Sequence, residues 1–356
     1  MKPHDTDPWM EETGPDADVV VSSRARLARN LSGFPFVNQA SAEQHLEIVQ
    51  LVRSFPINDA CGAPLSWTDM GNATPDVRQL LFERHLVSRQ FVDGDQPRVV
   101  AVGDNDALSV MVNEEDHLRM QVVLPGLQLA DAFSRVQAID LELGSSADLA
   151  VHPRWGYLTA CPTNLGTACR LSVMLHLPAL RITNEMERVR RAAKDLHLAV
   201  RGFYGEGSES SGDFYQISNQ ITLGVREEDL LSEFQAFVVP QLIDYEREAR
   251  RMLSDRNHTM VDDRIYRAMG TLRSARLLGI EEAMKLLSRV RLGVAMGRLL
   301  DFDLAQIQRL FLHIQPAHLL HHHSIDAHDD VTAPRGEEST VLRQLRADMM
   351  RSALNA

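Results

Sequence analysis

The sequence predicts an α+β fold, in which an antiparallel sheet flanked by helices is followed by an all-α C-terminal region. Before about residue 240, short segments alternate apolar and polar side chains, as strands with one buried face do. Between them lie segments with apolar residues three or four positions apart, which is the spacing of amphipathic helices. Beyond residue 240 the helical pattern continues almost to the end of the chain.

The strand pattern is clearest around residue 120. Segment 118–122 alternates apolar residues with Arg119 and Gln121, and segments 110–112 and 217–223 show the same period. Period-two alternation favours an antiparallel sheet with helices on one face and a polar opposite face. If the apolar residues of 118–122 face the helices, Arg119 faces the other side, where an arginine can line a ligand cleft.

Amphipathic helices are predicted on both sides of residue 240. The expected helices are 133–143, 186–196, 241–254, 260–278, 280–289, 303–313 and, after a loop at 324–339, about 339–353. Gly279 fits the end of one helix, and the acidic Glu281 and Glu282 fit the start of the next. A length of 356 residues suggests about two domains, and we expect an N-terminal segment 1–18, a domain 19–248 and a helical domain 249–356.

Composition excludes several classes of protein. The chain is 44% hydrophobic and 24% charged, which is too apolar and too mixed in charge for a disordered tail. It has no run of about 18 apolar residues for a membrane span, and its acidic start is unlike a signal peptide. Three cysteines are too few for a disulfide framework and indicate a reducing, cytoplasmic compartment. A net charge of −12 argues against nucleic-acid binding.

Arginine greatly outnumbers lysine. Only three residues are lysine, so 34 of the 37 basic residues are arginine. We expect codon bias to account for most of this excess. The chain has no GxxxxGK[ST] loop, so a nucleotide site must use side chains, and arginine forks suit phosphate oxygens. Five arginines stand in short, unusual motifs: Arg24, Arg26, Arg119, Arg170 and Arg201. Each alone also fits a structural arginine, and spacing does not show that they converge.

Two further features carry possible chemistry. The run Glu114-Glu115-Asp116 directly precedes a strand, where a carboxylate can orient a cationic substrate or accept a proton, although a solvated turn is the plainer alternative. Cys161 is followed by Pro162 and Thr163. The Thr163 hydroxyl or nearby arginines can stabilise a thiolate, whereas most lone cysteines in apolar contexts are buried small residues.

These motifs together resemble a known family. SSRAR at 22–26, NEEDHLR at 113–119, CPTNLGT at 161–167 and RGFYGE at 201–206 occur in the order found in the phosphagen (ATP:guanido) kinase superfamily. The resemblance covers about residues 19–245 and is closest to the bacterial protein-arginine kinases. It implies a catalytic domain with the glutamine-synthetase-like antiparallel sheet, followed by an all-α C-terminal domain that serves dimerisation and regulation.

The resemblance also implies site residues. It makes Glu115 and Glu206 the catalytic carboxylates and Cys161 the reactive cysteine. The matching nucleotide contacts are Ser22, Ser23, Arg24, Ala25, Arg26, His85, Arg119, Arg170, Leu171, Ser172, Val173, Met174, Arg201, Gly202, Phe203, Tyr204, Gly205 and Glu206. No metal-ligating residue is expected, and the cofactors are ATP and Mg²⁺.

The implied reaction is transfer of the γ-phosphoryl group of ATP to arginine. Kinases of small guanidines carry an extra N-terminal helical domain, whereas SSRAR begins here at residue 22. We therefore expect an open site that acts on arginine side chains of proteins. A kinase for free arginine or another small guanidine, and a catalytically inactive adaptor, are the alternatives. The family resemblance further implies a homodimer, a zinc-binding activator protein, a Clp chaperone or protease that receives marked proteins, and control of a stress repressor.

Three features depart from the family or stand outside it. Ala168-Cys169, before Arg170, stands where family members carry Gly-Leu or similar, and Cys169 is either a redox-sensitive thiol or a packed small side chain. An RDxxRA-type motif that binds phosphoarginine is matched at 342–347 only by its closing Arg-Ala, so that site is not carried over. The histidines between His318 and His328 lack cysteine or carboxylate partners at ligand spacing, which favours a helix end over a metal site.

Overall fold

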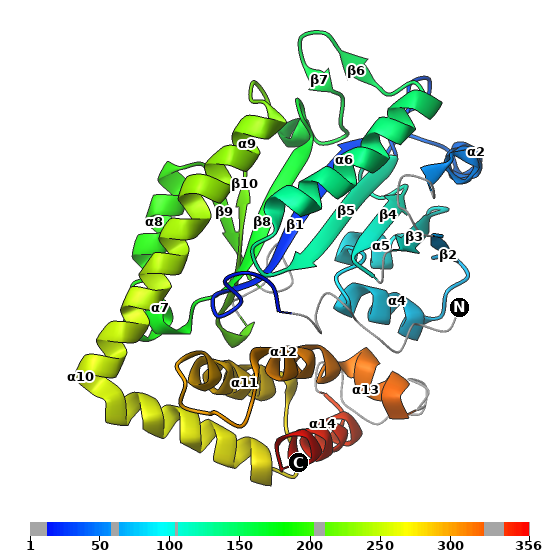
Figure 1. The fold of residues 1–356 in the computed structure, drawn as a ribbon. Helices are drawn as coiled ribbons and strands as arrows, with labels where there is room; N and C mark the ends of the chain where they lie inside the picture. Colours follow the sequence, from blue (N-terminus) through cyan, green and yellow to red (C-terminus); the bar gives the residue numbers. More distant parts are fainter. Residues whose placement is uncertain (1–12, 58–63, 104–105, 203–210, 324–337, 356) are drawn as a thin grey trace.

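The computed structural model describes residues 13–57, 64–103, 106–202, 211–323 and 338–355 (Figure 1). One antiparallel sheet of eight strands lies at its centre, in the order β2-β3-β4-β5-β1-β8-β10-β9. The strands are β1 (Val20–Arg29), β2 (Ser66–Asp69), β3 (Val99–Gly103), β4 (Leu108–Val112), β5 (Leu118–Pro125), β8 (Cys169–His176), β9 (Leu198–Arg201) and β10 (Phe214–Asn219). A separate hairpin pairs β6 (Val151–His152) with β7 (Gly156–Tyr157). The predicted α+β class is confirmed.

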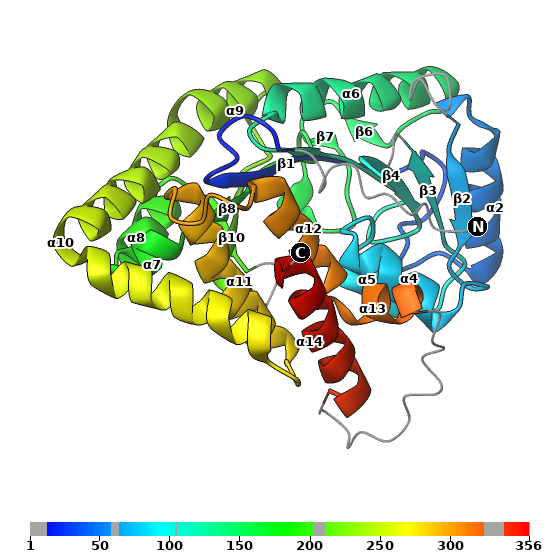
Figure 2. The same cartoon turned by 60° about the horizontal axis from the view of Figure 1, so that its bottom comes forward.

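One face of the sheet is the hydrophobic core. Helix α6 (Leu129–Ser146) crosses β1 and β5 on this face, as Figure 2 shows, and α2 (Ala42–Ser54) lies beside it. The predicted apolar stripe of α6 is buried, with Val136, Ile139 and Leu143 fully inaccessible. It packs against side chains such as Leu27 and Val122 in a single cluster. Burial of this amphipathic stripe fixes which strand positions point to the opposite face.

Other helices pack against the opposite face. At the β2–β4 end, α4 (Pro75–Glu83) and α5 (Arg89–Asp93) pack Phe82 and Phe91 against Met111. On the same face, Leu312 of α12 (Leu304–His313) packs against Val123 of β5, the strand next to β4. Positions of β5, β1, β8, β10 and β9 on this face carry the polar side chains considered below.

The chain beyond about residue 240 is helical, as predicted, but the helix boundaries differ. Its helices are α10 (Val239–Ser274), α11 (Ile280–Ala295), α12, α13 (Pro316–His323) and α14 (Thr340–Asn355). The shorter helices α7 (Pro178–Ile182), α8 (Met186–Asp195) and α9 (Glu227–Glu233) precede it. The predicted helices 241–254 and 260–278 form one 36-residue helix, α10, which is interrupted only by the non-helical φ/ψ of Asn257. That local deviation accounts for the break in the apolar pattern.

Three local predictions are wrong. The alternating segment 217–223 is a strand only as far as Asn219, the last residue of β10, and Ile221 and Leu223 beyond it are exposed. Gly279 does not end a helix, because α10 stops at Ser274 and Gly279 is the N-cap of α11 with an extended backbone. Glu281 and Glu282 do lie in the first turn of α11, as predicted. Leu196 follows the last residue of α8 and is 48% exposed, so it is not part of that helix's buried stripe.

Several arginines of the excess are structural. Arg29, Arg98, Arg291 and Arg346 are among the largest fully buried side chains. Arg346, in the degenerate tail motif, donates to the carbonyls of Leu278 and Ile314 (both 2.8 Å) and pairs with a carboxylate. These bonds hold α14 against the neighbouring helices.

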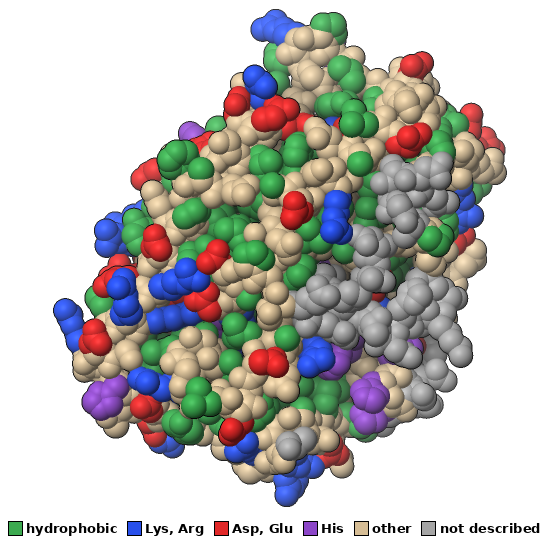
Figure 3. All heavy atoms as spheres, in the orientation of Figure 1, with side chains coloured by type: hydrophobic (Ala, Val, Ile, Leu, Met, Phe, Trp, Pro, Cys, Tyr) green, Lys and Arg blue, Asp and Glu red, His purple; other side chains and the backbone are tan. Residues whose placement is uncertain are grey.

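The surface in Figure 3 carries basic and acidic side chains interspersed, with hydrophobic groups between them. No helix within the described ranges is long and apolar enough to cross a membrane. No group of three or more His, Cys, Asp or Glu side chains that could hold a metal occurs among the residues that the structure places. His318 instead contacts the buried carboxylate of Glu83 through Nδ1 (3.0 Å), and His328 lies outside the described residues.

Candidate active site

The register of the central strands brings the motif arginines together. Arg26 of β1 pairs with Arg170 of β8 on one side and with Gln121 of β5 on the other. Arg24 pairs with Ser172 of β8. Directly paired residues of antiparallel strands, and alternate residues of one strand, point to the same face of a sheet. Arg24, Arg26 and Arg170 therefore share the face opposite α6.

The remaining two arginines lie on the same face. Arg119 is two residues from Gln121 on β5, so it is in phase with the side chains already placed. Arg201 of β9 pairs with Gln216 of β10, which in turn pairs with Met174 of β8. All five arginines thus project from one surface that spans β5, β1, β8 and β9, and we call it the arginine face.

The arginines are close enough to repel one another. Burial and then the charges of Arg119, Arg170 and Arg201 lower the pKa of Arg24 to about 10, which leaves it protonated at neutral pH. Burial, Arg119 and Arg24 lower the pKa of Arg26 well below its ordinary value. A ligand with several negative charges on this face would relieve the repulsion, so the residues present fit a polyphosphate.

The carboxylates of the NEEDHLR motif lie at the edge of the arginine face. Glu114 is buried and forms an ion pair with Arg119. Its Oε1 accepts from Ser88 Oγ (2.5 Å), and its Oε2 accepts from the backbone nitrogen of Glu115 (2.8 Å). Burial alone would raise the pKa of Glu114, but Arg119 and Ser88 hold it below its ordinary value.

Glu115 has the opposite electrostatic environment. Its side chain is partly buried, and this burial raises its pKa. The positive charge of Arg119 lowers the pKa, whereas the negative charges of Asp116 and Glu114 raise it further. A carboxylate with a raised pKa is a better proton acceptor than an ordinary glutamate. Neighbouring carboxylates with pKa values moved in opposite directions are typical of a pair with different tasks.

The loop that carries Cys161 is attached to this motif. Asp116 Oδ1 accepts from the backbone nitrogen of Ala160 (2.7 Å), and Asn164 Nδ2 donates to Glu115 Oε2 (3.4 Å). Cys161 is partly buried, and its Sγ lies 3.0 Å from Thr163 Oγ1, the contact expected from the sequence. The loop that carries the thiol therefore contacts Glu115 through Asn164.

Gly166 allows this loop to pack closely on the chain after β10. Its φ is +104°, and a Cβ there would lie 2.2 Å from the Thr222 carbonyl oxygen. Thr222 Oγ1 also donates to the Leu165 carbonyl oxygen (2.7 Å). No side chain fits between the two segments, which is why the motif has glycine at this position.

Not every expected nucleotide contact has its side chain on the arginine face. Ala25, Leu171 and Val173 are fully buried in the core on the α6 side, and only their backbone remains to contact a ligand. Ser23 is also turned inward, where its Oγ donates to the Gly126 carbonyl (2.8 Å). Ser22, Ser172 and Met174 are in phase with the arginines.

His85 follows α4 in a left-handed conformation, with φ of 58°. Its carbonyl oxygen accepts from Gln121 Nε2 (2.7 Å), which places it beside the arginine face. Burial, Arg24 and His318 lower its pKa to about 3, so its ring is neutral. Gly202 is buried next to Arg201, whereas Phe203, Tyr204, Gly205 and Glu206 lie outside the described residues, so the expected second carboxylate is not placed.

Sequence reasoning missed two polar residues of the site. Ser88 holds Glu114, and Gln216 donates from the arginine face to Ser172 Oγ (3.0 Å). Gln216 is in phase with Ser218 in the alternation of 217–223, so extending that pattern by one residue would have found it. Ser88 carries no local signal beyond its place as the N-cap of α5.

Comparisons with known proteins decide the family. Residues 50–249 match the ATP:guanido phosphotransferase C-terminal catalytic domain, and residues 258–356 match the protein-arginine kinase McsB C-terminal domain. The chain is 44% identical over 319 residues to the protein-arginine kinase of Moorella thermoacetica, covering 87% of this chain and 89% of that one. The chain belongs to the protein-arginine kinase branch of the ATP:guanido phosphotransferases.

Other relatives of this family agree in sequence and fold. The protein-arginine kinase of Symbiobacterium thermophilum is 44% identical over 313 residues, 87% of this chain and 88% of that one. The duplicated taurocyamine kinase of Schistosoma mansoni aligns with a TM-score of 0.59 and 26% identity, over 69% of this chain and 36% of its own. A lombricine kinase has the same fold, with a TM-score of 0.55 and 24% identity over 69% and 72% of the two chains.

The segment that matches the catalytic-domain family does not include all of the arginine face. The matched catalytic segment begins at residue 50, so β1 with Arg24 and Arg26 lies before it. These two arginines join the site through the pairing of β1 with β5 and β8. The arginine face of this phosphotransferase is therefore built from both sides of the boundary of the match.

Proposed function

We propose that the chain is a protein-arginine kinase that transfers the γ-phosphoryl group of ATP to the guanidinium of arginine side chains in proteins. The observation that carries the proposal is the convergence of five arginines on one face beside Glu115 and the loop of Cys161. Such a face suits a triphosphate, and the adjacent carboxylate suits a cationic acceptor.

The arginine face holds the phosphates in this proposal. Arg24, Arg26, Arg119, Arg170 and Arg201 neutralise oxygens of the triphosphate, and fixed guanidinium forks need little reorganisation as charge moves to the leaving ADP. Gly202–Glu206 and the backbone of residues 171–174 complete the nucleotide contacts. Mg²⁺ prefers phosphate oxygens and water with one or two carboxylates, so a dedicated cage of protein ligands is not required.

Glu115 acts on the acceptor. A guanidinium has a pKa above about 12, and its nitrogen lone pairs are delocalised, so it is a poor nucleophile until it is aligned and loses a proton. Glu115 binds the guanidinium and accepts that proton as the N–P bond forms and the bond to ADP breaks. Glu206 supplies a second carboxylate, and Cys161 as a thiolate adds negative charge beside the guanidinium. The products are N-phosphoarginine, ADP and the proton that Glu115 passes on.

Arginine in proteins is favoured over free arginine as the acceptor. The support is the similarity to relatives named protein-arginine kinases over 87% of the chain. Free arginine or another small guanidine remains the second candidate, because the fold is shared with lombricine and taurocyamine kinases. Incubation with Mg-ATP and either casein or free arginine separates the two. Phosphoarginine on the free amino acid alone would overturn the protein acceptor.

Further proposals rest on the family resemblance. We propose division into 1–18, a catalytic domain 19–248 and a dimerising helical domain 249–356; the two family matches meet between residues 249 and 258, within α10. We also propose a cytoplasmic homodimer that works with a zinc-binding activator and either marks proteins for a Clp protease or controls a stress repressor. Sedimentation of the purified chain tests the dimer, and co-purification from cells tests the partners.

A further inference from the structure

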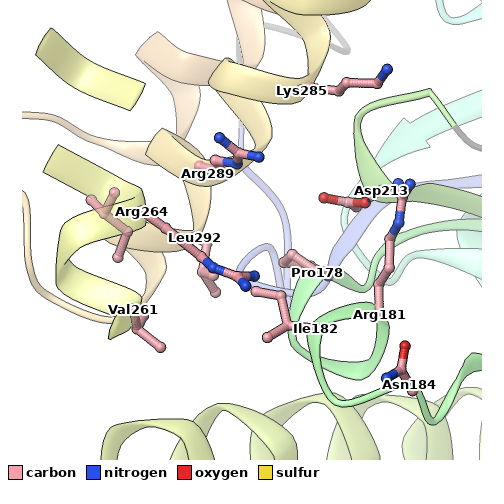
Figure 4. Close-up of a pocket in the computed structure, with 11 residues that line it drawn as sticks. Pro178, Arg181, Ile182, Asn184, Asp213, Val261, Arg264, Lys285, Arg289 and Leu292 are labelled. Atoms are coloured by element: carbon pink, nitrogen blue, oxygen red, sulfur yellow. Dashed lines mark hydrogen bonds and ion pairs between the residues drawn. The ribbon is translucent and has the colours of Figure 1, made fainter. Parts of the chain in front are cut away.

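A second cationic site lies away from the arginine face. A cavity of about 420 Å³ forms where α7, α10 and α11 meet, beyond the last residue of β8 (Figure 4). Arg181, Arg264, Lys285 and Arg289 line it, and Asp213 is its one carboxylate among the described residues. Four cations against one acid is unusual in a chain with a net charge of −12.

The single carboxylate is already engaged. Arg181 Nη1 donates to Asp213 Oδ1 (2.5 Å), and Ser288 Oγ donates to Oδ2 (2.7 Å). Ser288 also contacts buried His176 through Nε2 (2.9 Å), while Arg291 donates to Nδ1 of the same ring (2.8 Å).

This network fixes the direction of each hydrogen bond. Burial, and then the charge of Arg291, holds the pKa of His176 well below its ordinary value, so the ring is neutral. Because Nδ1 accepts from Arg291, Nε2 carries the proton and donates to Ser288, whose hydroxyl then donates to Asp213. Asp213 is thereby held at Arg181 and does not neutralise the other cations of the cavity.

Lys285 pairs with Glu281 (3.9 Å), so Arg264 and Arg289 are the cations left over. Within the described ranges, neither forms an ion pair or hydrogen bond with another residue. Figure 4 shows their guanidinium groups directed into the cavity from α10 and α11, across from Asp213. Ile182, Ile265 and Leu292 supply apolar walls, which strengthen charge interactions inside the cavity.

We propose that this cavity binds the phosphate group of a phosphorylated ligand, at a site distinct from the arginine face. A phosphate dianion can accept from two guanidinium forks at once and carries more charge than a carboxylate. The volume lies in the range of small-molecule sites and exceeds what a bare phosphate fills, so the ligand also carries an organic part against the apolar walls. A phosphorylated small molecule and a phosphorylated side chain of a protein share this chemistry.

Isothermal titration calorimetry tests the proposal, with a non-hydrolysable ATP analogue present at saturation to occupy the arginine face. The probes are inorganic phosphate, glycerol 3-phosphate and a phosphoserine peptide. We expect saturable binding of at least one organic phosphate, tighter than that of inorganic phosphate. Tighter binding of glycerol 3-phosphate would indicate a phosphorylated small molecule, and tighter binding of the phosphoserine peptide would indicate a phosphorylated side chain of a protein.

Two variants make the test specific. Arg264→Gln combined with Arg289→Gln is expected to weaken binding at least about tenfold, because two charge-assisted contacts are lost. Arg267→Gln on α10 is the matched control, since Arg267 is exposed, pairs with Asp263 and does not line the cavity. Exposed substitutions of this kind leave the fold intact, which thermal unfolding verifies.

Three results would overturn the proposal. These are no saturable binding of any probe, equal binding by the double variant and the wild type, and binding of inorganic phosphate without either organic phosphate. The comparison of the double variant with its control does not depend on the proposed kinase activity.

Discussion

Glu114 and Arg119 form a buried ion pair that connects the arginine face to the neighbouring carboxylate. The same Glu114 side chain accepts from the backbone nitrogen of Glu115. One carboxylate therefore contacts both an arginine of the arginine face and the backbone of the proposed proton acceptor. The pKa values of the two adjacent glutamates move in opposite directions, because Arg119 and Ser88 outweigh the burial of Glu114, whereas the burial of Glu115 is only partly offset by Arg119.

Glu114→Gln should impair both stability and turnover. Glutamine keeps the shape of the glutamate side chain but leaves Arg119 without its buried partner. Breaking a buried ion pair lowers the free energy of unfolding by about 3–5 kcal/mol at most. We expect a lower Tm and a kcat reduced at least about tenfold, since Glu115 and Arg119 both lose their anchor. Steady-state release of ADP and thermal unfolding measure the two effects. Glu43→Gln, exposed in the first turn of α2, is the control, and an equal kcat in both variants would contradict the role given to Glu114.

Glu115→Gln should abolish transfer while stabilising the fold. The folded-state pKa of Glu115 is raised, so the ionised side chain is less stable in the folded than in the unfolded chain at neutral pH. Removing the charge should raise the free energy of unfolding by less than about 1 kcal/mol, because the side chain is only partly buried. Denaturant unfolding measures this change, and calorimetry with ATP should show nearly unchanged affinity. Loss of stability together with retained turnover would refute the assignment.

The pH profile of kcat/KM should show the raised pKa directly. Transfer requires ionised Glu115, so activity is present above its pKa and lost as the pH falls through it. The midpoint of this acid limb should lie above 4.5, the ordinary value for a glutamate. ADP release is the suitable readout because the phosphoramidate product is acid-labile. Activity that stays constant down to pH 4.5 would speak against Glu115 as the proton acceptor.

Arg26→Gln should strengthen the ligand-free fold and weaken ATP binding. The mutual repulsion of Arg24, Arg26 and Arg119 is relieved when one charge is removed, which raises the Tm without nucleotide. Conversely, ATP at 100 times its Kd stabilises the wild type by about 2.7 kcal/mol, and the variant should need at least about tenfold more ATP for the same gain. Differential scanning fluorimetry with an ATP series measures both. Arg256→Gln, on the exposed side of α10, should change neither, and unchanged ATP affinity in Arg26→Gln would remove the arginine face as the phosphate site.

Features that depend only on neighbouring residues of the chain could be predicted from the sequence. Alternation around Arg119 predicted which side chains face away from the helices, and the apolar stripe of α6 was predicted residue by residue. The pairing of Arg26 with Arg170 joins strands far apart in the chain, and no local pattern encodes such a register. The motifs suggested that the arginines belong together, but only the sheet shows that they share a face.

The sequence pattern around Cys169 and Arg346 also could not predict that these side chains are buried. Cys169 is fully buried, and burial raises its pKa to about 12, which fits a packed small side chain. Arg346 looks like the remnant of a binding motif but is enclosed by carbonyls and a carboxylate. Both outcomes depend on which helices and strands surround the residue, and that information is not local to its segment.

Mass spectrometry of casein after incubation with Mg-ATP, under non-acidic conditions, tests the central claim most directly. The account predicts phosphorylated arginine residues with the wild type and none with Glu115→Gln. Phosphate found only on serine, threonine or tyrosine, or no phosphate on casein with a wild type that binds ATP, would contradict it.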